Sequence, residues 1–302
     1  MSGFTLYVVT GATASGKTDA AIELAGRLGC DIISADSRQI YRGIPITTAQ
    51  PSPEQLASVR HHFVGMLPLE AYYSAAQYEA DVLALIRKME SAGRKCAVMA
   101  GGSMMYMDAV TRGLDDLPTI SESVRADVMR LYKDHGLEHI RNELARLDPD
   151  YMAGADPMNH RRLLHALEII RESGRRLSDL RTGVVRKRPF EVKKFAIDMS
   201  RDELFGRINR RVELMMDAGM EQEARSVYHL RHLNSLNTVG FKEMFAAIEG
   251  VMTIAEAVSR IQKNTRVYAK KQLTWLRRDP DIEWLSPENV AGHICEVART
   301  HS

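Results

Sequence analysis

The sequence has few cysteines and no long hydrophobic run. Its three cysteines, Cys30, Cys96 and Cys295, are far apart and odd in number, which argues against a disulfide framework or a zinc site. No apolar stretch reaches the roughly 20 residues of a membrane-spanning helix, and the N-terminus lacks the pattern of a signal peptide. None of the ten histidines lies in an HExxH-like ligand pattern. We therefore expect a cytoplasmic protein without a membrane partner.

The chain also lacks a strong overall charge, since its net charge is only +2 over 302 residues. Its basic residues are nevertheless concentrated. Residues 160–195 hold eleven Lys and Arg against four Asp and Glu, and residues 260–278 hold seven basic residues and no acidic one. Two such stretches indicate a polyanionic partner, although either one alone is also typical of a solvated helix face.

Short apolar, β-branched runs alternate with helical patterns in the first hundred residues. We expect strands at residues 6–10, 31–35, 61–66 and 96–100, with a later one at 195–199. Helical spacing of apolar residues occurs at 19–28 and 78–91. Strands separated by helices predict a parallel sheet with right-handed crossovers.

The pattern becomes mostly helical after residue 117, with predicted helices at 121–135, 137–147 and 161–173 and further ones after residue 200. No internal repeat or low-complexity segment is present. The fold class that we predict is α/β, with a P-loop NTPase-like parallel sheet. Residues 1–117 and 190–302 would form this core with its helical C-terminal part, and residues 118–189 a helical insertion.

Residues 11–18 fit the phosphate-binding pattern GxxxxGK[ST], after a predicted strand and at the start of a predicted helix. Glycines let backbone N–H groups point into one anion-binding concavity, and the helix N-terminus adds positive partial charge. Lys17 supplies a full charge, and the Thr18 hydroxyl is suited to hold Mg²⁺. We predict that a diphosphate or longer phosphate chain binds Gly11, Ala12, Thr13, Ala14, Ser15, Gly16, Lys17 and Thr18.

Two further polar residues follow predicted strands. Asp36 comes directly after residues 31–35, and Ser103 follows Gly101-Gly102 after residues 96–100. Because the carboxyl ends of parallel strands face the ligand crevice, Thr18, Asp36 and Ser103 should converge. Asp36 alone is equally compatible with a turn or helix-cap aspartate.

Five motifs, in order, resemble the bacterial tRNA dimethylallyltransferases, also called tRNA isopentenyltransferases or the IPP transferase family. They are GATASGKT (11–18), ISADSRQIYRGIPITTAQP (33–51), AGGSMMY (100–106), NTVGFKE (237–243) and NTRVYAKKQLTWLRR (264–278). The resemblance runs from about residue 6 to residue 286. The phosphate loop by itself is not specific, whereas the stretches around Asp36 and Lys270–Trp275 are.

The resemblance implies transfer of a dimethylallyl group from dimethylallyl diphosphate to N6 of the adenosine 3′ to the anticodon, in tRNAs that read codons beginning with U. It implies Mg²⁺ as cofactor, held at Thr18, and the tRNA anticodon stem-loop as partner. Asp36 would be the general base, with Thr18, Ser103 and Arg207 also catalytic and Arg211 at the diphosphate. The tRNA contacts that it implies are Asp36, Ser37, Arg38, Gln39, Ser103, Arg125, Arg161, Arg162, Gly240, Phe241, Lys242, Lys270 and Lys271.

The chain departs from the family pattern in places. His165 stands where an arginine is usual, and Gly65-Met66 replaces a strand-ending aspartate. Met104, Met105 and Met107 fit either an isoprenoid pocket or, as we favour, packing on the sheet. Tyr268 and Trp275 lie seven residues apart on one helical face, and we expect them in the core.

Three rival functions remain open from the residues alone. A small-molecule P-loop kinase would commonly carry an acid after residues 96–100, which is missing here. A dimethylallyltransferase acting on free AMP or ATP would have little use for a basic helical insertion. A non-catalytic RNA-binding ATPase would not need Asp36. The sequence does not determine the oligomeric state, and we take a monomer as the expectation.

Overall fold

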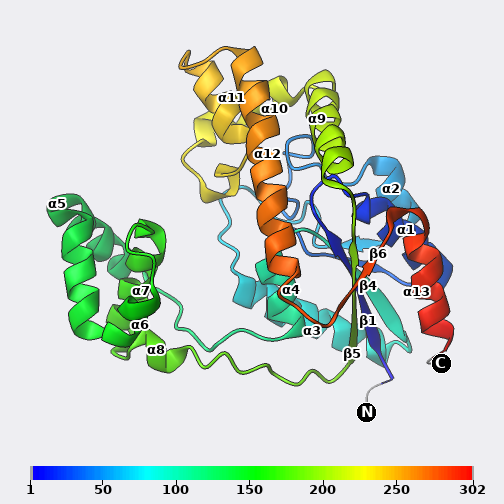
Figure 1. Ribbon diagram of the computed structural model, residues 1–302, viewed down its shortest axis with the longest axis horizontal. Coiled ribbons are helices and arrows are strands. Elements are labelled where there is room, and N and C mark those ends of the chain that lie inside the picture. Colours follow the sequence, from blue (N-terminus) through cyan, green and yellow to red (C-terminus); the bar gives the residue numbers. More distant parts are fainter. Residues whose placement is uncertain (1–2, 301–302) are drawn as a thin grey trace. The chain divides into compact units, whose positions relative to one another are not determined.

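The computed structural model describes residues 3–300, and its larger unit is built around a parallel six-stranded sheet (Figure 1). The strand order is β3-β2-β4-β1-β5-β6. The strands are β1 Thr5–Gly11, β2 Ile32–Ser34, β3 His61–His62, β4 Cys96–Ala100, β5 Glu191–Ile197 and β6 Ile282–Leu285. All five neighbouring pairs are parallel, so the predicted α/β fold with a parallel sheet is confirmed.

Three strands differ from the prediction. Strand β5 covers Glu191–Ile197, whereas the expected strand was 195–199. The expected strand at 61–66 is only His61–His62, because Phe63 adopts a φ of 64°, a left-handed conformation that no strand accommodates. Strand β6, at the edge of the sheet, was not predicted. Its four residues are too few to give a clear alternating pattern.

Helices cover both faces of the sheet, as a parallel sheet requires (Figure 1). Helices α3 (Ala75–Ser91) and α4 (Met104–Thr111) pack on the face that contains Val8. Helices α1 (Lys17–Leu28) and α13 (Val290–Arg299) pack on the face that contains Val9, while the short helix α2 spans Pro53–Ser58. The carboxyl ends of the central strands remain free to carry the loops described below.

The C-terminal helices α9 (Arg201–Asp217), α10 (Met220–Val227), α11 (Phe241–Ile248) and α12 (Ile254–Leu276) share a second core. Short 3₁₀ turns lie at Tyr228–Leu230, Asn234–Leu236 and Pro287–Asn289. Ala269 of α12 and Ile208 of α9 also pack against Ala12, which brings both helices to the phosphate loop. Within residues 3–300, no helix has both the length and the apolar content needed to cross a membrane.

Residues Arg112–Lys187 form a second compact unit, whereas the predicted insertion was 118–189. It contains α5 (Glu122–Leu147), α6 (Pro149–Gly154), α7 (His160–Ser173) and α8 (Leu177–Leu180) around its own apolar core. Gly136 has non-helical angles (φ 75°, ψ −177°) and divides α5 where the sequence separated two helices. The unit therefore has the core that an independent helical domain needs.

Candidate active site

The loop between β1 and α1 has the geometry of an anion cradle. Gly16 caps α1 with a φ of 91°, and Ala14 has a φ of 66°, so the chain curls tightly before the helix begins. The Ser15 hydroxyl is buried and has no hydrogen-bond partner among the described residues. A buried hydroxyl without a partner is costly, and a bound phosphate oxygen would satisfy it. The loop thus fits an oxyanion ligand.

Two partly buried cations flank this loop. The Lys17 ammonium donates to the Ala12 carbonyl at 3.2 Å, and Arg211 Nη1 of α9 donates to the Thr13 hydroxyl at 3.3 Å. Burial and then the neighbouring Arg211 lower the pKa of Lys17 to about 8, against an opposing effect of Asp36. Burial also lowers the pKa of Arg211, again opposed by Asp36. Such a site favours a multiply charged anion.

The lowered pKa of Lys17 predicts that the affinity for pyrophosphate falls as the pH rises through about 8. Only the protonated amine attracts the anion, so binding near this pH should also take up a proton. Calorimetry of pyrophosphate binding in buffers of different ionisation enthalpy measures both effects. Pyrophosphate also titrates, but it does so equally in experiments with a Lys17→Met variant. The difference in pH dependence between the two proteins therefore measures the contribution of Lys17. An identical pH dependence in both would contradict the assignment.

A cavity of about 310 Å³ opens beside these groups. Residues 49–51 also line it. The segment just before them is held against α10, because the Glu223 carboxylate accepts the backbone N–H groups of Ile46 (2.8 Å) and Thr47 (2.7 Å). The cavity brings the two predicted arginines of α9 together with the phosphate loop. It is lined by Ala14, Gly16, Lys17, Thr18, Asp19, Ala49, Gln50, Pro51, Gln55, Arg207 and Arg211.

The candidate site has two halves. The phosphate loop is the first, and the residues that follow β2 and β4 form the second. Asp36 Oδ1 accepts the backbone N–H of Arg38 at 2.9 Å and of Gln39 at 3.3 Å. The Ser103 hydroxyl accepts the Ser37 N–H at 2.8 Å and donates to the Ser37 hydroxyl at 3.1 Å. The negative charge of Asp36 raises the pKa values of Lys17 and Arg211, against the larger lowering by burial. Ser103 and the turn next to Asp36 are joined directly, but neither Asp36 nor Ser103 lines the cavity that Thr18 lines, so the convergence of all three stays a prediction.

This arrangement requires glycine at position 101. A Cβ atom there would lie 2.2 Å from the Ala35 carbonyl oxygen, which itself accepts the Ser103 N–H at 3.0 Å. We predict that Gly101→Ala lowers the free energy of unfolding by about 1–3 kcal/mol, as overpacking typically does. Thermal and urea denaturation measure the change. The control Gly26→Ala, in α1 with no heavy atom within 4 Å of the new Cβ, should not destabilise the protein. Equal stability of the two variants would contradict this packing.

Two aromatic residues that the sequence placed in the core are not there. Tyr268 and Trp275 are 39% and 38% exposed, because their face of α12 points away from the apolar clusters. The Trp275 indole N–H donates to Asp108 Oδ2 at 3.0 Å, and the Tyr268 hydroxyl donates to the Gly102 carbonyl at 3.3 Å. Burial of that hydroxyl, with Asp36 nearby, raises the pKa of Tyr268 to about 12. Tyr268 is thus a neighbour of the site that sequence reasoning missed.

Several residues implied as tRNA contacts have structural partners already. The Arg38 guanidinium donates to the carbonyls of Asn234 (2.6 Å) and Ser235 (3.2 Å), and the Gln39 amide donates to those of Thr48 and Ala49. These bonds hold the 36–51 loop against its neighbours. Both side chains therefore shape the crevice, whatever else they contact.

The Phe241 side chain is fully buried in the core of the C-terminal helices, so any contact of this residue with tRNA would have to involve its backbone. The adjacent Gly240 caps α11 with a φ of 102°, and Lys242 is exposed. Lys270 and Lys271 are exposed on α12, with the Lys270 ammonium 5.6 Å from the centre of the Phe205 ring. The three lysines remain accessible to a polyanion.

In the insertion unit, Arg161 and Arg162 are exposed at the start of α7, and Arg125 is half-buried on α5. His165, which stands where the family has arginine, is exposed with its ring 3.2 Å from Glu168. Arg161, Arg162 and His165 thus share one surface helix, on which they are open to solvent.

The residues around Thr18 fit Mg²⁺. The Thr18 hydroxyl and the Asp19 carboxylate are hard oxygen donors on the cavity wall. Within residues 3–300 no three His, Cys, Asp or Glu side chains cluster as a metal cage. Mg²⁺ commonly uses one or two protein oxygens, with water and substrate phosphates completing its shell, so this donor set suits it.

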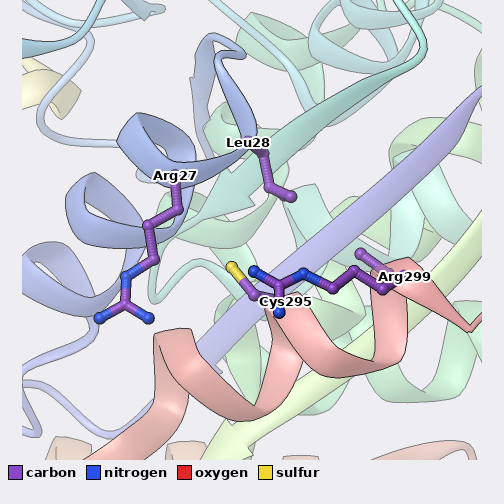
Figure 2. Close-up of a pocket in the computed structure, with 5 residues that line it drawn as sticks. Arg27, Leu28, Cys295 and Arg299 are labelled. Carbon is purple, nitrogen blue, oxygen red and sulfur yellow. The ribbon is translucent and has the colours of Figure 1, made fainter.

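The methionines of α4 mostly pack on the sheet, and none of them lines the cavity beside the phosphate loop. Met107 is buried in the sheet core and Met104 packs against it, which supports the packing role that we favoured, whereas Met105 is 60% exposed. A separate hollow of about 420 Å³ is lined by Arg27 and Leu28 of α1 and by Cys295, Ala298 and Arg299 of α13 (Figure 2). Arg27 at its edge already pairs with Glu23, and we assign no ligand to this hollow.

The parallel sheet and its phosphate loop define a P-loop-like α/β enzyme. The family model for IPP transferase matches residues 39–279, and the chain belongs to this family of prenyltransferases. It is 49% identical over 290 residues to tRNA dimethylallyltransferase 1 of Porphyromonas gingivalis, with 96% of each chain covered. It is 47% identical over 284 residues to tRNA dimethylallyltransferase 1 of Phocaeicola vulgatus, with 94% of each covered.

Solved structures agree with this assignment. The tRNA isopentenylpyrophosphate transferase of Bacillus halodurans superposes with a TM-score of 0.72 at 31% identity, covering 98% of this chain and 96% of that one. A eukaryotic dimethylallyltransferase, described as acting on tRNA, superposes with a TM-score of 0.79. Its identity is 22%, over 98% of this chain and 77% of that one, so this second likeness is one of fold.

Proposed function

We propose that the protein transfers a dimethylallyl group from dimethylallyl diphosphate to N6 of the adenosine 3′ to the anticodon, in tRNAs that read codons beginning with U. The reaction releases diphosphate. The chain is an IPP transferase, and its relatives carry the name tRNA dimethylallyltransferase. The observation that carries the proposal is the cavity at the phosphate loop, where the cations Lys17 and Arg211 lie together.

These groups suit the bonds that change. The bond between C1 of the isoprenoid and the diphosphate oxygen breaks as the bond between C1 and N6 forms. Negative charge grows on the diphosphate, where the amides of residues 11–18, Lys17 and Arg211 stabilise it without reorganising. N6 loses one proton as it attacks, and the Asp36 carboxylate accepts it before releasing it to water.

Other residues of the crevice support these steps. Arg207, on the cavity wall and 2.9 Å from Glu203, adds positive charge for the departing diphosphate. Ser103 holds Ser37 and so fixes the turn that carries Asp36. Mg²⁺, held by Thr18, would neutralise phosphate charge when bound.

The tRNA would bind mainly through its backbone. The target adenine must leave the anticodon-loop stack to reach the crevice, a step typical of enzymes that modify bases. Exposed cations such as Lys242, Lys270, Lys271, Arg161 and Arg162 would contact phosphates of the stem-loop. Because such contacts release counterions, tRNA affinity should fall steeply with salt.

Mass analysis of nucleosides tests the proposal. The protein is incubated with dimethylallyl diphosphate, Mg²⁺ and unmodified tRNA, and the tRNA is digested to nucleosides. We expect one adenosine per substrate tRNA to gain the mass of a dimethylallyl group. Parallel reactions with AMP or ATP as acceptor should give no product. Unmodified adenosine, or modification of the free nucleotide alone, would refute the proposal.

A further inference from the structure

Gln272 of α12 connects the two halves of the candidate site. It is only 1% exposed, although it directly follows two exposed lysines, Lys270 and Lys271, in the helix. Its side-chain oxygen accepts the Thr13 N–H at 2.9 Å, and its side-chain nitrogen donates to the Gly102 carbonyl at 2.9 Å. Since one partner is a donor and the other an acceptor, the orientation of the amide is fixed.

Each partner of Gln272 belongs to a different half. Thr13 lies in the phosphate loop, and its hydroxyl accepts a hydrogen bond from Arg211. Gly102 precedes Ser103, whose hydroxyl holds the turn next to Asp36. A path of hydrogen bonds therefore runs from the anion cradle, through the Gln272 amide, to the turn that carries the carboxylate.

The surroundings leave the amide little freedom. A Cβ on Gly102 would lie 2.6 Å from the Gln272 nitrogen and 3.7 Å from Lys17 Cε, so close approach depends on glycine there. One turn earlier on α12, Ala269 packs against Ala12 and Tyr268 also donates to the Gly102 carbonyl. The helix is thus seated on both segments, and Gln272 is its polar contact with each.

We propose that Gln272 is a positioning residue that fixes the distance between the diphosphate cradle and the Asp36–Ser103 turn. A misplacement of about 1 Å between reacting groups is enough to cost on the order of 10²-fold in rate. The inference rests on the proposed prenyl transfer, but the effect of Gln272 on the phosphate loop can be measured by pyrophosphate binding without that reaction.

Two replacements separate this role from packing. Gln272→Met keeps the length and approximate volume of the side chain but makes neither hydrogen bond. Gln272→Glu keeps the acceptor for the Thr13 N–H and places an oxygen against the Gly102 carbonyl. The matched control is Gln262→Met on the same helix, because within residues 3–300 the Gln262 side chain makes one hydrogen bond, to the Asn209 carbonyl at 3.3 Å.

We expect Gln272→Met and Gln272→Glu to lower kcat for prenyl transfer on the order of 10²-fold. The KM for tRNA should stay within about three-fold. Because a loss of folded protein would lower the apparent kcat and leave KM unchanged, kcat is calculated per folded protein. Affinity for pyrophosphate with Mg²⁺, measured by calorimetry, should also fall several-fold in Gln272→Met. The Gln262→Met control should match the wild type in all three measurements.

The outcomes are distinct. If kcat and pyrophosphate affinity of folded Gln272→Met equal those of the wild type, the positioning role is refuted. If Gln272→Met does not fold, Gln272→Glu provides the same test, and failure of both to fold would make the residue structural and overturn the proposal. If the wild type transfers no dimethylallyl group, the proposed function fails, while pyrophosphate binding still decides the role of Gln272.

Discussion

Asp36→Asn is expected to slow prenyl transfer by about 10²–10⁴-fold, the usual contribution of a general base. Asparagine keeps an Oδ1 acceptor for the N–H groups of Arg38 and Gln39, so the turn should retain its shape. What it loses is the basicity needed to accept the N6 proton. The single-turnover rate at saturating tRNA and dimethylallyl diphosphate measures the loss, and filter binding should show tRNA affinity changed only a few-fold.

A control next to the same strand removes a carboxylate that has no part in the candidate site. Asp31 lies at the opposite end of β2, where it pairs with His62 at 2.9 Å. Asp31→Asn should therefore leave the rate of transfer unchanged. An undiminished rate in Asp36→Asn would remove Asp36 as the base and assign it to the turn alone.

Lys17→Met is expected to reduce kcat by about 10²–10³-fold, the typical cost of losing one preorganised group at a developing negative charge. The KM for dimethylallyl diphosphate should rise as well, since the substrate already carries the charge that Lys17 attracts. Methionine has a similar length and leaves the Ala12 carbonyl without its donor at 3.2 Å. Steady-state kinetics with dimethylallyl diphosphate as the varied substrate measures both parameters.

The matched control is Lys88→Met, which removes one exposed ammonium near the end of α3. Its kinetics should equal those of the wild type. If Lys17→Met transferred dimethylallyl groups at the wild-type rate, the loop at residues 11–18 would not be the diphosphate site.

The phosphate loop and the strands around it were predictable because their signals are local. Gly11, Gly16 and Lys17 are fixed by the conformation and charge of one eight-residue loop. The apolar runs that give β1 and β4 are continuous, as expected for strands buried on both faces. Asp36 and Ser103 followed from the rule that strand ends converge on the crevice.

The contributions of α12 and α10 could not be predicted in the same way. Gln272 lies 259 residues from Thr13, and Glu223 lies 176 residues from Thr47, so nothing in the local pattern relates them. Tyr268 and Trp275 show a related limit, since helical spacing identifies a shared face but not the direction in which it points. Phe241 was assigned by motif to RNA contact, yet its side chain fills a core.

The most direct test of the account is a crystal structure with a non-reactive analogue of dimethylallyl diphosphate and an anticodon stem-loop. The account predicts that the diphosphate lies on the amides of residues 11–18 with Lys17 and Arg211. It also predicts an extruded adenine whose N6 lies about 2.6–3.2 Å from the Asp36 carboxylate, within hydrogen-bond reach. A diphosphate bound elsewhere, or a carboxylate turned away from N6, would contradict it.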